Sequence, residues 1–279
     1  MELKADVSLL TPNWRKSRIS SILNAERAIQ AGIIVGAIII WEILGRIGLL
    51  YGLVPTFSAT IQATWTLLVT GKIWPDIVVS CYEIGAGTLI AVVSGVIVGF
   101  ILAPIEYVRK VFEPLVVYFG SVPKVILFPI ALLVASIGPE SKIVLGAVSG
   151  FVPILLNIMV GFREVDEKYV KMAKSKGATR FQLYQKVYLP AMVYPVFAGI
   201  RLGLGVAITG ALLGETKAAN HGLGFITQNY YENFSVASMY AVLLIIFVGA
   251  GIINLIMTAI LARLTKFKAS DIEQRRAIM

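Results

Sequence analysis

The chain has 279 residues, of which 57% are hydrophobic and 15% charged, and its formal net charge at pH 7 is +9. Soluble domains usually carry about 25% charged residues, so this composition excludes an ordinary soluble protein and indicates that lipid is the main solvent. A single histidine and a single cysteine exclude an intrachain disulfide and a metal site built from several histidines or thiolates. The excess of Lys and Arg is typical of a membrane topology signal, and we expect neither a cofactor nor a nucleic-acid partner.

The N-terminal segment, residues 1–27, contains the acidic Glu2 and Asp6 and then the polar stretch Thr11–Arg18 before any apolar run begins. A secretory signal peptide instead has a basic start followed by a short apolar core. We therefore predict that this segment is retained in the cytoplasm and that the first apolar run is an anchor.

Six apolar runs are long enough to cross a membrane, because a hydrocarbon core of ~30 Å needs roughly 20 apolar residues per helix. The predicted spans are Ala28–Leu50, Val78–Pro104, Leu115–Ile137, Ile143–Phe162, Ala191–Gly214 and Val236–Ala262. The predicted fold class is thus an all-α membrane protein with six transmembrane helices in residues 28–262, followed by a cytoplasmic tail of residues 263–279. The shorter run Thr56–Val69 is bounded by Pro55 and Gly71, and we expect it to form an amphipathic helix at the outer interface.

Positive residues gather in alternate connections between these spans. They are Lys4, Arg15, Lys16, Arg18 and Arg27 before the first span, Arg109 and Lys110 after the second, Arg163, Lys168, Lys171, Lys174, Lys176, Arg180 and Lys186 after the fourth, and Arg263, Lys266, Lys268, Arg275 and Arg276 after the sixth. The other connections contain only Lys72, Lys142 and Lys217, with Arg46 near a helix end. The positive-inside rule then places both termini and the long loop after the fourth span in the cytoplasm.

Glycines spaced four residues apart recur within the predicted spans. The pairs are Gly32/Gly36, Gly95/Gly99, Gly146/Gly150, Gly199/Gly203 and Gly210/Gly214. Small residues at this spacing let two helices approach closely. We interpret them as packing positions of a compact bundle.

The third span contains Pro114, Pro123 and Pro129. Proline removes a helical hydrogen bond and frees a backbone carbonyl, and broken helices of this kind often line a transport pathway. We predict a kinked third span whose Ser121, Val122 and Lys124 line such a pathway.

Four charged residues fall within or at the ends of the spans, namely Glu83, Lys124, Arg201 and Glu215. A charge at mid-bilayer costs ~2.5–3.5 kcal/mol on insertion scales, so such residues usually face a cavity or a partner charge. Our hypothesis is that Glu83 and Lys124 face the translocation pathway or pair across the second and third spans. A buried ion pair without substrate contact is the equally weighted alternative, and Arg201 and Glu215 are either structural partners or pathway residues.

The loop after the fourth span, Arg163–Pro190, has the pattern of two short helices. Its first half places Val165, Tyr169, Met172 and Ala173 at helical spacing, and Gly177 is suited to end that helix. Thr179 can cap a second helix with Phe181, Tyr184, Val187 and Tyr188 on one face. Pro190 then begins the fifth span, where its missing N–H costs little. From these residues alone the loop is either a docking element or a solvated surface.

The spacing Ala173-x3-Gly177, then nine residues, then Val187-x-Leu189-Pro190 resembles the EAA signature of binding-protein-dependent ABC permeases, E-A-A-x3-G-x9-I-x-L-P. Lys171 stands at the usual glutamate and Met172 at the first alanine, while Val187 replaces isoleucine conservatively. The lost glutamate removes any acidic contact at that position. The resemblance covers about residues 53–267 and is strongest toward the nitrate, sulfonate, taurine and bicarbonate branch. The segments that carry it are Val122–Pro129, Ile137–Lys142, Gly199–Gly205 and Gly214–Gly224.

The resemblance implies a type I ABC importer permease fold and an alternating-access mechanism. In this family the loop inserts into a groove of a separate ATPase, so the implied docking residues are Lys171, Met172, Ala173, Gly177, Ala178, Val187, Leu189 and Pro190. The implied partners are ABC ATPase subunits, an extracytoplasmic binding protein and a second permease copy, most simply as a homodimer in a bacterial or archaeal plasma membrane. The branch implies a small anionic solute, and its members often have a basic residue where this chain has Glu83.

Two other functions fit a polytopic membrane protein. A secondary transporter driven by an ion gradient would predict intramembrane carboxylates or inverted repeats and no docking loop. A membrane-bound enzyme would need a catalytic cluster, which scattered carboxylates and single His and Cys residues do not offer. The sequence also lacks a G-x-x-x-x-G-K-[ST] phosphate loop, so we expect ATP hydrolysis on partner subunits and no enzymatic activity in this chain.

Overall fold

The computed structural model describes residues 13–48 and 53–277, and these residues form helices and no strands. The chain divides into two compact units, Met1–Ala63 and Thr64–Met279. Helices α1 (Asn13–Ile47) and α11 (Val236–Ala277) run through the predicted boundaries at residues 27/28 and 262/263. Residues 1–12 and 278–279 of the two predicted cytoplasmic segments, and residues 49–50 of the first predicted span, lie outside the described residues.

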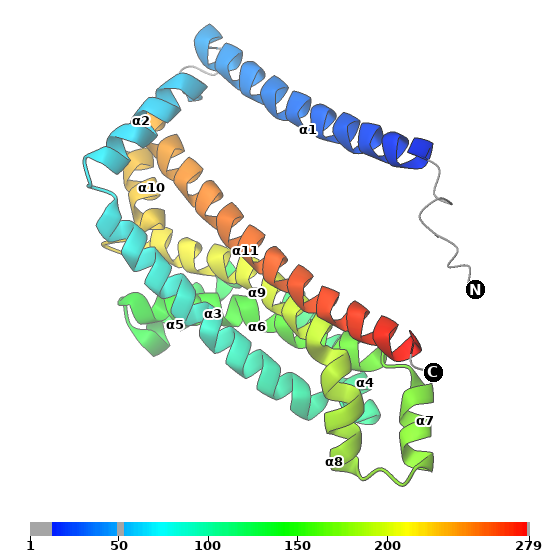
Figure 1. Cartoon of the computed structure of the whole chain (residues 1–279). Coiled ribbons are helices and arrows are strands. Elements are labelled where there is room, and N and C mark those ends of the chain that lie inside the picture. The colour runs from blue at the N-terminus through cyan, green and yellow to red at the C-terminus, as the bar shows by residue number, and fades with distance from the viewer. Residues whose placement is uncertain (1–12, 49–52, 278–279) are drawn as a thin grey trace. The chain divides into compact units, whose positions relative to one another are not determined.

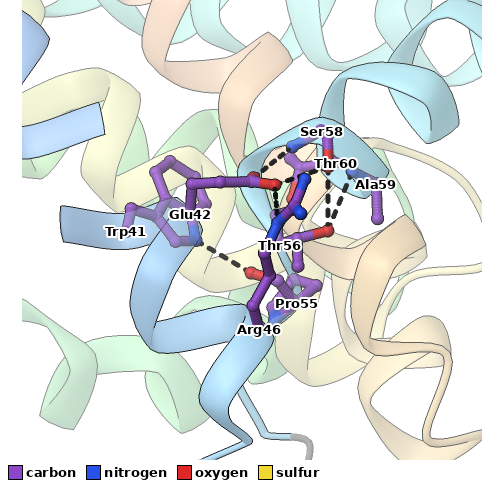
Figure 2. Close-up of polar contacts among 8 residues, drawn as sticks. All are labelled: Trp41, Glu42, Arg46, Pro55, Thr56, Ser58, Ala59 and Thr60. Atoms are coloured by element: carbon purple, nitrogen blue, oxygen red, sulfur yellow. Dashed lines mark hydrogen bonds and ion pairs between the residues drawn. The ribbon is translucent and has the colours of Figure 1, made fainter. Parts of the chain in front are cut away.

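Polar contacts join the end of α1 to the start of α2 (Phe57–Val69), as Figure 2 shows. The Trp41 indole N–H donates to the Pro55 carbonyl at 3.0 Å. The Glu42 carboxylate accepts from the backbone N–H of Ser58 at 3.0 Å and from its hydroxyl at 3.1 Å. A carboxylate at a helix N-terminus satisfies amide groups that have no partner inside the helix. The helix predicted at Thr56–Val69 is therefore present, with Thr56 as the residue before it.

The second unit continues with a series of helices connected by short turns. In chain order they are α3 (Trp74–Leu102), α4 (Glu106–Ser121), η2 (Lys124–Leu127), α5 (Phe128–Ala135), α6 (Pro139–Arg163), α7 (Glu167–Ser175), α8 (Arg180–Leu183), η3 (Tyr184–Tyr188), α9 (Leu189–Ala218), α10 (Leu223–Glu232) and α11. Among the described residues, 5 helices are long and apolar enough to cross a membrane, and a bent pair raises the number to 6 if it counts as one span.

That bent pair is the predicted third span. Residues Glu106–Ser121 and Lys124–Ala135 meet at an angle of 87°, so Leu115–Ile137 is not one continuous helix. The break falls at Val122 and Pro123, whose backbones are extended with ψ of 128° and 117°. Extended geometry is favoured for a residue before proline, because the proline ring clashes with a helical neighbour. The predicted kink is therefore a sharp break.

Helices α3, α6 and α9 lie side by side and form the centre of the second unit (Figure 1). The buried face of α3 repeats every three or four residues, and its members are Asp76, Ser80, Glu83, Gly87, Ala91, Gly95 and Gly99. A Cβ on Gly150 of α6 would lie 2.9 Å from the carbonyl oxygen of Gly203 on α9, and one on Gly95 would lie 2.9 Å from Ile154. These glycines therefore permit close helix packing within one chain, whereas a Cβ on Gly32 or Gly36 would have no described atom within 4 Å.

Candidate functional site: the loop after α6 and the groove beside α4

The loop between α6 and α9 begins with a capped helix. The Asp166 carboxylate accepts a hydrogen bond from the Lys168 backbone N–H at 2.9 Å and so caps α7. At the other end of α7, the N–H groups of Gly177 and Ala178 donate to the carbonyls of Lys174 and Ala173 at 2.9 and 3.1 Å. Gly177 has φ +75°, the left-handed geometry that glycine adopts without a Cβ penalty. The predicted glycine break is thus a tight helix-ending turn.

A second capped helix follows the turn directly. The Thr179 hydroxyl accepts from the Gln182 backbone N–H at 3.2 Å, and the Gln182 side chain accepts from the Thr179 N–H at 3.0 Å. This reciprocal pair is a capping box, which satisfies two amide groups at the start of α8. The sequence pattern predicts Thr179 as a cap, but it did not lead us to expect the contribution of Gln182.

The second helix does not stop where the fifth span is predicted to begin. Residues Tyr184–Tyr188 form a wider π-helical turn that leads into α9 without an interruption. Pro190 lies in the first turn of α9 and has no N–H to donate. We attribute the wider turn to this missing donor. Arg180–Ala218 is consequently one helical segment of 39 residues.

An aromatic cluster anchors the loop to the bundle. The Tyr184 ring contacts Phe100 of α3 and Phe162 of α6 at centroid distances of 6.0 and 6.3 Å, and its hydroxyl donates to the Phe100 carbonyl at 3.1 Å. Tyr188 lies 5.1 Å from Phe162. Aromatic pairs at these distances add to the free energy gained from burial. Sequence analysis identified the helical spacing of Tyr184 and Tyr188 but not their partners on α3 and α6.

The loop also exposes large apolar side chains. Tyr169 is 62% exposed, Met172 is 55% exposed and Phe181 is 74% exposed. Leu183, by contrast, is buried against the bundle. Several large apolar side chains exposed on one short loop are typical of a protein–protein contact surface.

Lys171 stands where the resembling family has glutamate. Its ammonium forms an ion pair of 2.9 Å with Glu167, one turn earlier in α7, and both side chains are exposed. The hydrogen bond to this carboxylate raises the pKa of Lys171 above its ordinary value. The side chain therefore presents a positive charge to solvent at this position.

A groove of 620 Å³ lies where α4 breaks, next to α6 and α9. It is lined by Val117, Gly120, Ser121, Val122, Pro123, Lys124, Ser149, Val152, Pro153, Leu156, Asn157, Leu202 and Val206. The Lys124 ammonium donates to the carbonyl oxygens of Phe119, Gly120 and Val122 at 3.0, 2.9 and 2.7 Å. A cation at the C-terminal end of a helix satisfies carbonyls that have no partner inside the helix. Lys124 is the one charged residue among the described residues that line this groove.

Glu83 and Lys124 do not pair, which corrects one form of our hypothesis. Lys124 is held by carbonyls of α4, whereas Glu83 is buried at 2% exposure beside Glu215 of α9 and Lys142 of α6. Glu83 also lines neither this groove nor the second one described below. Sequence spacing does not reveal the carbonyl partners of Lys124.

Arg201 lies at a second groove, of 1070 Å³, between α9, α10 and α11. Its Nε donates to the Asn254 side-chain oxygen of α11 at 2.8 Å. Arg201 is therefore partnered by an amide, and Glu215 is not its counter-ion. Lys142, expected in a connection between spans, lies inside α6 and is 2% exposed.

Residues 91–267 match the model of the family described as the binding-protein-dependent transport system inner membrane component. The matched stretch is more than half of the chain and includes the loop, the groove and the α6–α9 packing. The chain belongs to this family. It is the membrane-spanning permease subunit of an ABC importer.

Individual relatives and a solved structure agree with this assignment. The permease is 29% identical over 193 residues to the taurine transport system permease protein TauC of Escherichia coli K12, a match that covers 69% of this chain and 70% of that protein. It is 27% identical over 231 residues to the putative aliphatic sulfonates transport permease protein SsuC of the same organism. This match covers 82% of this chain and 88% of that protein. A chain of the inward-facing MetNI methionine ABC transporter superposes with a TM-score of 0.61 at 20% identity, over 69% of this permease and 95% of that chain, and supports the fold. The ion-gradient transporter and the membrane-bound enzyme are therefore set aside.

Proposed function

We propose that the loop Arg163–Pro190 is the surface on which a separate ABC ATPase docks. The observation that carries the proposal is the pair of capped helices around Gly177, on which Tyr169, Met172 and Phe181 are exposed while Tyr184 and Tyr188 pack against the bundle. A loop that exposes apolar side chains to a partner and packs its aromatic rings against the bundle can transmit a movement of the partner to the helices. The positive residues of the loop support its placement in the cytoplasm, together with both termini.

Replacing Phe181 with Ser tests the docking surface. If the exposed ring is buried by the ATPase, its loss removes about 2 kcal/mol of apolar burial, or roughly 30-fold in affinity. We therefore expect the ATPase to be largely lost when the tagged permease is purified with its ATPase and binding protein. The mass of the wild-type complex would also report whether two permease copies are present, as we propose.

Phe234→Ser is the matched control for this experiment. Phe234 is 83% exposed in the turn between α10 and α11, at the end of the bundle opposite to the loop in our proposed topology. The control should retain the ATPase at the wild-type level. Equal retention of the ATPase by Phe181→Ser would show that the docking surface lies elsewhere.

We further propose that the groove beside the α4 break is part of the translocation pathway, with Ser121 and Lys124 in its lining. The groove is open and largely apolar, and it lies on α6 and α9, the second of which continues directly into the loop. One ammonium in an apolar lining suits a small anion, the substrate class we propose, and the names of the taurine and sulfonate relatives are consistent with it. An extracytoplasmic binding protein would then supply most of the selectivity.

Replacing Lys124 with Met tests the pathway. The substitution removes the charge from the groove and frees the carbonyls at the end of α4. Because the three N–H groups of the ammonium already donate to these carbonyls, an anion loses the electrostatic attraction of the charge, about 1–4 kcal/mol at 4 Å. We expect roughly tenfold slower uptake of a sulfonate per permease molecule, with membrane abundance close to wild type. The comparison is Lys72→Met, which changes a lysine in the α2–α3 turn and should have no effect on uptake. Reduced abundance with unchanged uptake per molecule would limit Lys124 to a structural role.

A further inference from the structure

We propose that Glu83 and Glu215 form a proton-binding site inside the bundle, in which two carboxyl groups share one proton. The site lies between α3, α6 and α9, at the ends of these helices that face away from the docking loop. It does not line either groove described above. The inference is therefore independent of the proposed pathway and docking surface.

Within the described part of the chain, two buried carboxyl oxygens lack a donor. Glu83 is 2% exposed and Glu215 is 1% exposed. Oε2 of Glu83 and Oε1 of Glu215 receive no hydrogen bond from any N–H or hydroxyl group of the described residues. The two carboxyl groups are neighbours, because Ser80, one turn before Glu83 on the buried face of α3, donates to Glu215 at 2.9 Å. An unsatisfied buried polar atom costs about 1–3 kcal/mol, and more when it is charged, so a proton between the carboxyl groups satisfies both oxygens at once.

The other oxygen of Glu215 is fully engaged. Its Oε2 accepts from the Ser80 hydroxyl at 2.9 Å and from the Gly224 backbone N–H at 2.7 Å. Two donors on one oxygen favour the ionised form of that carboxyl group. The geometry therefore assigns the proton to Glu83, which donates to a Glu215 carboxylate.

The charges around Glu83 and Glu215 favour a state in which the two carboxyl groups together carry one negative charge. Lys142 is buried beside the pair: a Cβ on Gly214, the residue before Glu215, would lie 3.0 Å from its Cγ atom, and its ammonium donates to the carbonyls of Ile137 and Gly138 at 2.7 and 3.0 Å. Glu140 adds a further negative charge in the vicinity of Glu83. Two ionised carboxylates beside a single ammonium would leave an uncompensated buried charge, which is costly in a medium of low dielectric constant.

A metal ion does not fit the site as well as a proton. The described residues contain no group of three or more His, Cys, Asp or Glu side chains placed to hold a metal. Asp76, the next carboxylate on the buried face of α3, accepts from the Gly222 N–H at 2.8 Å and lies 3.7 Å from the His221 ring. It is therefore committed to the turn between α9 and α10.

The proton has a structural consequence for that turn. Ser80 donates to Glu215 and accepts from the Leu223 N–H at 2.8 Å, so the α9–α10 turn is held through the carboxyl pair. Loss of the proton would put two negative charges between α3 and α9. We expect this loss to loosen the contact between these helices and the turn.

Infrared difference spectroscopy of the full-length permease in lipid nanodiscs tests the proposal. The wild-type minus Glu83→Gln spectrum at neutral pH should contain the C=O stretching band of a protonated carboxylic acid, which shifts in D2O and disappears as the pH is raised. Gln retains a donor toward Glu215 but cannot ionise, so the variant should fold. Glu215→Gln provides a second test and should also remove the wild-type carboxylic acid band.

The control is Glu140→Gln, which removes an exposed carboxylate of the same neighbourhood and should leave the band in place. A folded protein that binds a proton which its unfolded chain releases loses stability as pH rises, about tenfold in the folding equilibrium for each pH unit. The unfolding midpoint of the wild type should therefore fall more steeply with rising pH than that of Glu83→Gln. Absence of the acid band in the folded wild type, or equal pH slopes, would overturn the proposal.

Discussion

Replacing Gly177 with Asp should leave the permease folded in the membrane and abolish most ATP-driven uptake. Gly177 is exposed at the tip between α7 and α8, and a Cβ placed on it would have no described atom within 4 Å. Its φ of +75° makes any side chain unfavourable, by ~1 kcal/mol for a single left-handed residue. That cost is small beside a typical stability of about 5–15 kcal/mol, so the chain alone should tolerate the change.

The complex should not tolerate it. Aspartate would place a bulky charge at the centre of the proposed contact, where the ATPase must approach the turn closely, and a buried unpaired charge costs several kcal/mol. We expect uptake to fall by more than tenfold, while the ATPase of the complex hydrolyses ATP without coupling. The measurement is uptake and ATP hydrolysis in the same proteoliposomes.

Gly71→Asp is the control for backbone strain. Gly71 also has φ +75°, and the nearest atom that an added Cβ would meet is 4.0 Å away, but it lies in the α2–α3 turn. The Gly71→Asp variant should have the same backbone strain as Gly177→Asp and should leave uptake at the wild-type level. Normal coupled transport in Gly177→Asp would show that the ATPase contact is misplaced.

Replacing Gly203 with Leu should prevent α9 from packing on α6. A Cβ at this position would lie 2.6 Å from the Ile154 Cγ1 atom and 2.8 Å from the Gly150 carbonyl oxygen. Backbone atoms cannot move aside as a flexible side chain does, so the helices must separate. Overpacking usually costs about 1–3 kcal/mol, and a whole leucine between two touching backbones should exceed that range. We expect a lower thermal unfolding midpoint and loss of the monodisperse peak in size-exclusion chromatography.

Gly205→Leu separates this effect from helix propensity and from added apolar bulk. Gly205 is exposed on the same helix, and a Cβ there would have no described atom within 4 Å. Leucine is a better helix former than glycine by roughly 0.8 kcal/mol, so this control should be at least as stable as wild type. A wild-type unfolding midpoint for Gly203→Leu would contradict the close α6–α9 contact.

Local sequence patterns predicted the elements better than their partners. Proline positions predicted a kink in the third span, and Gly177 and Thr179 predicted the two helices of the loop, because each signal depends on neighbouring backbone geometry. The 87° angle of the break and the groove beside Lys124 depend on the tertiary positions of α6 and α9. Those positions result from the packing of distant glycines.

Buried polar partners were the least predictable part. Lys142 follows a Gly-Pro pair, and its sequence context predicts a connection between spans. However, α6 begins at Pro139, so Lys142 lies within the helix and is buried. Glu83 and Glu215 belong to different spans, and no local spacing relates them. Pairing of Glu83 with Lys124 was one of the two forms of our hypothesis, whereas the carbonyls at the broken end of α4 are the acceptors that Lys124 contacts.

If the ATPase docks on the loop as we propose, the continuous helical segment Arg180–Ala218 would act as a mechanical lever. Its 39 residues, at 1.5 Å per residue, extend ~58 Å. A tilt of about 5° imposed at the end near Phe181 would, by the same geometry, displace the far end, which carries Glu215, by ~5 Å. The wider turn at Tyr184–Tyr188 connects α8 to α9 without a gap in the helix, although Pro190 lies in the first turn of α9. In that proposal, a small rotation at the docking loop would become a larger displacement at the carboxyl pair of Glu83 and Glu215.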